Sequence, residues 1–322
     1  MLKVNPARLG EFLRLIDANA RLPEYCLVLE LWLDQFAVRQ LAVDAVQSRI
    51  IHRLPRVQKL ILNSAVTTLR NKDGSVRTIR RADIGLPLDE TLSAMCAATW
   101  ITSLVLAPCY DPRWTLQVLN AFSLHITHLT LYVQKPNSIL LTKFPNCPQL
   151  RHVELPFPVL GDAAGLLPLL NQSPNLLHLS ISHLKVDATG VRCLNKPQFP
   201  LVHAPLDTLN LTYIRDAKFL RVLVSSVPTR ALNILFESEN HASDLRNITG
   251  ALFPESATRQ KPGHLRVLHL ERSGRNVERS TIEERNIALE VLREHCIQSH
   301  VELKYHVPVS PLCTLLLRGL AD

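Results

Sequence analysis

The sequence is poor in the residues and motifs from which nucleotide-binding and catalytic sites are built. Its 322 residues include only 10 glycines and 5% aromatic residues. The patterns GxxxxGK[ST], GxGxxG after a strand, GxSxG and HExxH do not occur. The closest approach to a phosphate-binding loop, GDAAG at Gly161 to Gly165, is better explained as a turn before a helix. We therefore predict that the chain is not an enzyme and that it has no catalytic residue, cofactor or metal.

Long apolar runs are also lacking. The longest, Leu166 to Leu170 and Leu312 to Leu317, fall far short of a membrane span, and the first residues lack a signal-peptide core. The seven cysteines are odd in number and contain no CxxC pair, which fits reduced thiols better than a disulfide framework. We expect a cytoplasmic or nuclear protein without a membrane partner.

What the sequence does contain is a repeat rich in aliphatic residues. Apolar residues make up 47% of the chain, and a pattern of apolar-x-x-apolar-x-apolar recurs along it. The middle positions of successive copies are Leu29, Leu60, Leu104, Leu129, Val153, Leu179, Leu209, Leu232 and Leu268. Their separations range from 23 to 44 residues, and the shorter ones match the period of leucine-rich repeats. The copy that begins at Thr229 is the weakest, because a polar residue occupies its first apolar position.

The pattern predicts one strand and one helix or loop per repeat. Apolar and polar residues alternate at the end of each copy, as in a strand with one buried face, and helical periodicity follows, for example over Phe36 to Arg53. Prolines precede several strands, where they stop a helix and favour an extended chain. We predict an α/β fold: a leucine-rich-repeat-like solenoid with a curved parallel sheet on its concave side and helices and loops on its convex side.

The predicted solenoid covers residues 1–322 as a single domain. An N-terminal cap is expected at 1–25, in which Phe12, Leu13, Leu15 and Ile16 cover the first repeat. Nine to ten irregular repeats fill 26–307, with a β-hairpin insertion at 66–81 around an Asp73-Gly74 turn. A polar loop is expected at 237–264, a last strand at Val301 to Val307, and a C-terminal cap at 308–322.

The candidate site is the row of side chains that alternation places on the concave face. Histidines occupy the same position in three consecutive repeats, and strands about 4.8 Å apart would stack them into a ladder. We interpret the ladder as a polar surface row, with a protein-binding patch that responds to pH and a metal site as lesser alternatives. Trp32 either joins this face or packs under the N-terminal cap. The predicted partner-binding residues are Trp32, His128, Thr130, Tyr132, His152, Glu154, His178, Ser180, Asn210 and His269.

Two other chemistries remain as alternatives. Basic residues gather on the predicted hairpin and again late in the chain, which allows binding of an acidic partner or RNA, although no aromatic residues interleave with them. The two clusters comprise Arg70, Lys72, Arg77, Arg80 and Arg81, and Arg259, Lys261, Arg266, Arg272, Arg275 and Arg279. A nucleophilic pair of Cys147 with His152 is the least favoured hypothesis.

The repeats resemble those of fungal F-box proteins with degenerate leucine-rich repeats. The segments that carry the resemblance are FLRLIDANARLPEYCLVLELW from Phe12 to Trp32, LPRVQKLIL, ITSLVL, CPQLRHVELPF and SPNLLHLSIS. In that family an F-box docks on the Skp adaptor of a cullin ubiquitin ligase, and the repeats recognise the substrate. Only 11 residues precede Phe12, too few for an F-box, so binding of the Skp adaptor is not expected. The resemblance implies a protein-protein interaction module whose target is not specified by the sequence.

Overall fold

A computed structural model describes most of the repeat strands and several of the connecting helices. The residues that it describes are 2–4, 9–19, 21–33, 49–64, 68–70, 76–78, 89–106, 112–132, 143–156, 159–160, 166–182, 185–186, 205–212, 220, 223, 227–236, 241–253, 264–272 and 281–306. They form two compact units, one of Met1–Leu155 with Leu166–Leu176 and the other of Pro156–Gly165 with Leu177–Asp322. Each unit combines parallel strands with helices, so the predicted α/β class is confirmed. The predicted C-terminal cap, 308–322, lies outside the described residues.

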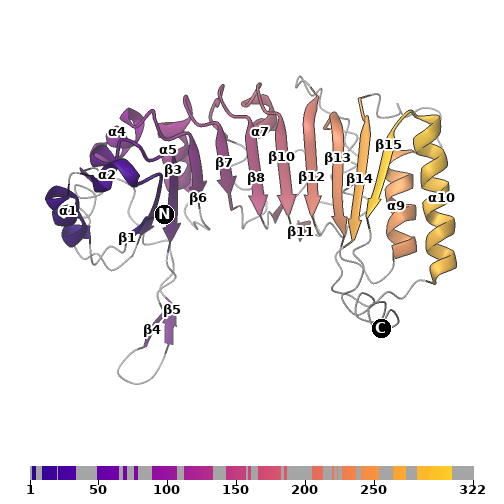
Figure 1. Ribbon diagram of the computed structural model, residues 1–322, viewed down its shortest axis with the longest axis horizontal. Helices are drawn as coiled ribbons and strands as arrows, with labels where there is room; N and C mark the ends of the chain where they lie inside the picture. The colour runs from indigo at the N-terminus through magenta and orange to yellow at the C-terminus, as the bar shows by residue number, and fades with distance from the viewer. Residues whose placement is uncertain are drawn as a thin grey trace, which may run out of the picture. The chain divides into compact units, whose positions relative to one another are not determined.

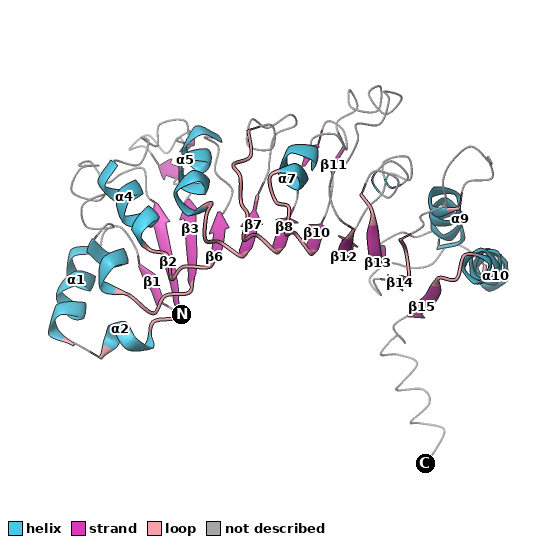
Figure 2. Cartoon of the chain, turned by 90° about the horizontal axis from the view of Figure 1, so that it is seen from above, coloured by secondary structure: helices cyan, strands magenta, loops and turns pink. Residues whose placement is uncertain are grey.

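The first unit is a run of parallel strands with helices on one side (Figures 1 and 2). Its strands are, in the order in which they pair, β1 (Leu2–Val4), β2 (Val28–Leu33), β3 (Lys59–Ser64), β6 (Ser103–Leu106), β7 (His128–Leu131) and β8 (His152–Pro156). Its helices are α1 (Leu9–Ala18), α2 (Leu22–Tyr25), α4 (Asp89–Ala97), α5 (Pro112–Phe122) and α7 (Leu167–Asn171). Figure 2 shows α4, α5 and α7 on the same side of the strands. The side of these strands opposite the helices, and the side of the second unit's strands opposite its buried aliphatic rows, are each called the strand face of that unit below.

The second unit repeats this plan. Its strands pair in the order β10 (His178–Ser182), β12 (Leu206–Thr212), β13 (Thr229–Phe236), β14 (Val267–Arg272) and β15 (Glu302–His306), all parallel. A separate parallel pair is formed by β9 (Val159–Leu160) and β11 (Lys185–Val186). The helices α9 (His241–Leu252) and α10 (Ile282–Gln298) pack against each other, and α10 also contacts β15. Phe253 and His295 join the two helices through rings stacked 5.5 Å apart.

The core of both units consists of aliphatic side chains in register from strand to strand. In the first unit Leu60, Leu104 and Leu129 pair in register and are buried. In the second unit Leu179, Leu209, Leu232 and Leu268 do the same. Two residues later each strand has a second buried aliphatic position, because successive side chains of a strand point to opposite sides. The apolar positions of the repeat therefore form two continuous rows on the helix side.

The first unit contains four tight turns, of which three lead into its strands β3, β6 and β8. In each turn the N–H of the fourth residue donates to the carbonyl of the first, at 3.0 to 3.2 Å. The turns span 54–57, 98–101, 147–150 and 173–176. Three have proline second, Pro55, Pro148 and Pro174, where the fixed φ suits the turn and no N–H is needed. The prolines precede strands, as the sequence indicated, and the side chain of Asn175 adds a 2.7 Å hydrogen bond to the carbonyl of Pro148.

A second backbone feature recurs where four strands of the first unit, β3, β6, β7 and β8, begin. The carbonyl of Leu27 accepts hydrogen bonds from the N–H groups of Gln58 and Lys59, at 2.9 and 3.2 Å. The carbonyls of Gln58, Thr102 and Thr127 do the same for the pair of residues that enters the next strand. One carbonyl thus holds two consecutive N–H groups of the following repeat, which fixes where pairing starts.

The hairpin segment forms a separate antiparallel pair. Strands β4 (Thr68–Arg70) and β5 (Val76–Thr78) pair with Leu69 opposite Arg77. The predicted Asp73-Gly74 turn and the side chains of both strands lie outside the described residues.

Three expectations about the connecting segments are corrected by the structure. The loop expected at 237–264 contains the helix α9, because Ala242, Leu245 and Ile248 are spaced to face the core and are buried there. Leu15 was expected in the N-terminal cap but is 55% exposed, because Leu13 and Ile16 lie on the buried face of α1 and Leu15 does not. The N-terminal cap also contains a strand that the repeat pattern did not predict, β1, which pairs with β2.

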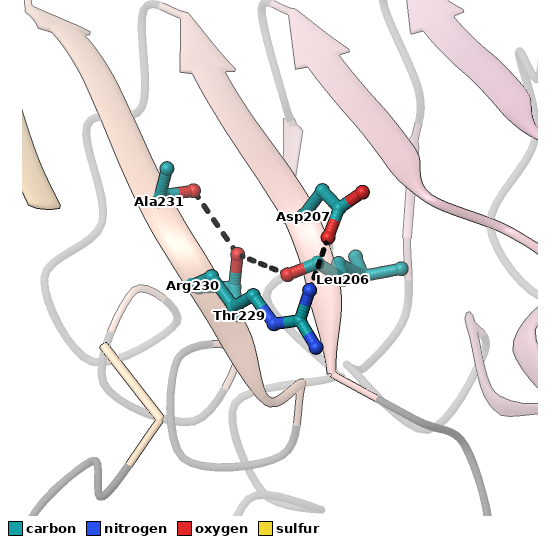
Figure 3. Close-up of polar contacts among 5 residues, drawn as sticks. All are labelled: Leu206, Asp207, Thr229, Arg230 and Ala231. Carbon is teal, nitrogen blue, oxygen red and sulfur yellow. Dashed lines mark hydrogen bonds and ion pairs between the residues drawn. The ribbon is translucent and has the colours of Figure 1, made fainter. Parts of the chain in front are cut away.

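The repeat that begins at Thr229 shows how a polar residue is accommodated at an apolar position. Thr229 is only 4% exposed, and its hydroxyl lies 3.0 Å from the carbonyl oxygen of Ala231 and 3.4 Å from that of Leu206 (Figure 3). A hydroxyl has one hydrogen, so these two carbonyls share it. Beside it, Arg230 reaches across to Asp207 at 2.9 Å on the more exposed side of the strands. The buried hydroxyl is therefore hydrogen-bonded, which removes most of the cost of its burial.

Leu104→Ala should lower the free energy of unfolding by about 2 to 5 kcal/mol, because it leaves a cavity in a row of buried side chains. Val105→Ala, on the same strand but facing the other way and half-buried, should cost less than about 1 kcal/mol. Urea denaturation followed by circular dichroism measures both. Equal costs would contradict the assignment of the two faces of β6.

Thr229→Val keeps the shape of the side chain but removes the hydroxyl from the carbonyls of Leu206 and Ala231. We expect a loss of about 1 kcal/mol in the free energy of unfolding, the usual net contribution of one hydrogen bond. Thr208→Val, at a half-buried position on the strand face, is the matched control and should change stability by less than about 0.5 kcal/mol. A Thr229→Val protein that is more stable than the wild type would show that the position is an ordinary apolar one.

Candidate strand-face binding site

The strand face of the first unit carries two rows of side chains in register. The first row consists of Val28, Lys59, Ser103, His128 and His152. The second row, two residues further along each strand, consists of Glu30, Ile61, Val105, Thr130 and Glu154. Parallel pairing places neighbours in a row about 4.8 Å apart, so groups on adjacent strands can touch.

Two of the three predicted ladder histidines stack on each other. The rings of His128 and His152 have centroids 4.3 Å apart and are inclined by only 2°. Their strands pair with His128 opposite His152, as the equivalent sequence positions predicted. His178 begins β10 in the second unit, at the equivalent position of its strand.

Hydrogen bonds hold the side chains around the stacked pair. The hydroxyl of Thr127 lies 2.8 Å from Nδ1 of His128 and 3.2 Å from the carbonyl oxygen of Thr102. With one hydrogen, the hydroxyl either donates to Nδ1, or donates to the carbonyl and accepts from Nδ1–H. In the second row, the hydroxyl of Thr130 donates to Oε2 of Glu154 at 3.1 Å. The imidazole of His128 and the carboxylate of Glu154 are thus each oriented by a neighbouring threonine.

In the second unit the corresponding row contains amides. Ser180, Asn210, Asn233, His269 and Lys304 pair in register from β10 to β15. The side-chain amide of Asn233 donates to Oδ1 of Asn210 at 2.7 Å, so the two asparagines form a short ladder. Three of the predicted site residues, Ser180, Asn210 and His269, therefore lie in one row, each of them partly accessible.

The structure describes the side chain of one of the two predicted aromatic anchors and only the backbone of the other. Tyr132 directly follows β7, is partly exposed, and its backbone N–H donates to the carbonyl of Leu106 at 3.3 Å. Trp32 lies in β2 with Asn63 as its register partner, but its side chain lies outside the described part of the chain.

Four further residues belong to the same surface and were not among the predicted site residues: Lys59, Ile61, Ser103 and Val105. The register places Lys59 and Ser103 in the row of His128 and His152, and Ile61 and Val105 in the row of Thr130 and Glu154. All four are partly exposed. Alignment of the first apolar positions of the repeats would have identified them.

The described basic residues and cysteines bear on the two alternative chemistries. Of the late basic cluster, Arg266 is the one whose side chain is described, and it is exposed; the side chains of the hairpin cluster lie outside the described residues. Burial raises the pKa of Cys147 to about 12, so this thiol stays protonated at neutral pH and is a poor nucleophile. Burial likewise raises the pKa of Cys296 to about 11 and that of Cys26.

Within the described ranges, no three histidine, cysteine, aspartate or glutamate side chains group closely enough to hold a metal ion. None of the helices described has both the length and the apolar character that crossing a membrane requires. No protein-family model matches the chain, and no curated protein shows significant sequence similarity to it.

Thiol alkylation tests the environment of the cysteines. At pH 8 a maleimide should label Cys96, which is exposed, much faster than Cys147, whose pKa of about 12 leaves a very small thiolate fraction. In the folded protein the thiol of Cys147 stays protonated up to about pH 12. We therefore expect Cys147 to react only after unfolding. Peptide mapping by mass spectrometry, with and without denaturant, measures both rates. Faster labelling of Cys147 than of Cys96 in the folded protein would revive the nucleophile hypothesis.

Proposed function

We propose that the chain is a leucine-rich-repeat-like solenoid that recognises a protein target through the strand face and has no catalytic activity. The observation that carries this proposal is the organisation of that face. His128 stacks on His152, Thr130 holds Glu154, and Asn233 holds Asn210. Side chains that are held by their neighbours lose less conformational freedom on binding, and such preorganised surfaces favour specific recognition.

The composition of the face also favours a protein partner. Imidazole, carboxylate, amide and hydroxyl groups lie beside partly exposed Ile61, Val105 and Tyr132. Mixed polar and apolar groups with an aromatic side chain are typical of protein interfaces. Single-strand nucleic acid binders instead need a continuous basic groove with stacking aromatics.

The biological context that we propose is target recognition like that of F-box substrate adaptors of cullin ubiquitin ligases. Its support is the sequence resemblance of the repeats together with the parallel α/β repeats of the fold. The free, buried thiols of Cys26, Cys147 and Cys296 are in keeping with a reducing compartment such as the cytoplasm or nucleus.

A triple variant, Tyr132→Ala, His152→Ala and Glu154→Ala, should weaken capture of the target by at least about tenfold, since loss of one anchor residue typically costs 1 kcal/mol or more. The measurement is quantitative pull-down from a cell extract, with the purified chain as bait and mass spectrometry as the readout. A matched control changes three exposed residues of α10: Glu283→Ala, Glu294→Ala and Gln298→Ala.

The control should capture the same proteins as the wild type. Capture of every partner by the triple variant at wild-type levels would show that the strand face of the first unit is not the binding surface. Capture that instead falls steeply with salt and yields RNA would favour the basic clusters.

A further inference from the structure

The row that contains the stacked histidines has a small residue beside them. Ser103 lies between Lys59 and His128, and these three residues pair in register on β3, β6 and β7. With strands about 4.8 Å apart, the backbones of Lys59 and His128 are separated by roughly 10 Å at this point. The serine side chain is small, so the row has little bulk between a lysine and a histidine; this position is called the low point below.

The stacking geometry shows which way the His128 ring faces. Its centroid is 4.3 Å from that of His152, close to the strand spacing, and the rings are parallel within 2°. The normal to the rings therefore runs roughly across the strands. One face of His128 is against His152, and the opposite face is directed toward the position of Ser103 on β6.

Side chains of the second row lie next to this position, further along the strands. Val105 lies two residues after Ser103 and Ile61 two residues after Lys59, so both side chains point to the same side as Ser103. Both are partly exposed although they are aliphatic. An imidazole face, two aliphatic side chains, a lysine and a hydroxyl therefore border one low point of the strand face.

We propose that this low point at Ser103 receives an aromatic side chain of the protein target, which continues the histidine stack. An aromatic ring placed there lies about one strand spacing from His128, within the range of offset stacking. On its other side it lies within reach of the Lys59 ammonium, which is attracted to the face of an aromatic ring. This proposal rests on the proposed function and specifies the chemistry that the strand face recognises.

The charged groups of this face favour a protein side chain over a nucleobase. A nucleic acid brings phosphates to the surface together with its bases. Among the described residues of these rows, the accessible charged side chains are Lys59 and Glu154, beside the imidazoles of His128 and His152, whereas Glu30 is only 5% exposed. A lysine beside a carboxylate is not the continuous basic groove that tracks a nucleic-acid backbone.

The experiment is a titration of the full chain with N-acetyltryptophanamide, followed by NMR of the histidine rings and valine methyl groups. Ring currents of the bound indole should shift the signals of His128 and Val105 in a saturable manner. Ser103→Leu, which fills the low point, should weaken binding of the probe at least about tenfold. His128→Ala, which removes the stacking partner, should weaken it by a similar factor. Thr208→Leu places the same side chain at a half-buried strand-face position of β12 and should leave the affinity unchanged.

Two further ligands test the chemical class. N-acetyl-leucinamide should bind much more weakly, and equal affinity would overturn the aromatic assignment. Adenosine that binds more tightly than the indole probe would overturn the choice of a protein side chain. No saturable shift up to the solubility limit of the probe, or equal affinity in wild type and Ser103→Leu, would overturn the site itself.

Failure of the aromatic site can be distinguished from failure of the proposed function. Loss of target capture in the Tyr132, His152 and Glu154 triple variant, with no effect of Ser103→Leu on the probe, would refute only the aromatic site. Retained capture in the triple variant would refute the use of this face as a whole.

Discussion

Parallel pairing in a fixed register organises both units of this chain. Each strand forms its backbone hydrogen bonds with the strands before and after it in the same unit, and equivalent positions of the repeats come to lie side by side. A shift of one residue would move Leu104 to the surface and Ser103 into the core, because strand side chains alternate between faces. The aliphatic rows and the rows of the strand face therefore depend on the same pairing, and the core and the candidate site are specified together.

This dependence also explains which side chains of the face act jointly. The stack of His128 on His152 and the hydrogen bond from Thr130 to Glu154 both link β7 to β8, and both connect register partners. The amide ladder of Asn210 and Asn233 links β12 to β13 in the same manner. Residues distant in sequence become neighbours by occupying the same place in successive repeats, so the strand face behaves as a two-dimensional array whose chemistry changes from strand to strand.

Much of this arrangement was predictable from the sequence, since alternation of apolar and polar residues determines both the strands and their buried sides. The histidine stack followed from equal positions in two repeats, and Pro148 and Pro174 precede strands as expected. The helix α9 was missed because its polar residues concealed a regular spacing of Ala242, Leu245 and Ile248. Three residues of β1 carry too little pattern to be recognised. The low point at Ser103 was overlooked because it arises from a small side chain, whereas sequence reasoning searches for reactive groups.

The carbonyl that accepts two N–H groups at each strand entrance has a consequence for how such a chain can evolve. Because Gln58 and Thr102 each hold the start of the next strand through their own carbonyls, the register of pairing is set anew at the starts of β6 and β7. The length of a connecting segment then has no effect on the alignment of the strands that follow. Residues can be gained or lost between strands, as spacings from 23 to 44 residues attest, while the register of the strands is kept. The length of a connection and the side chains of the strands can therefore change independently.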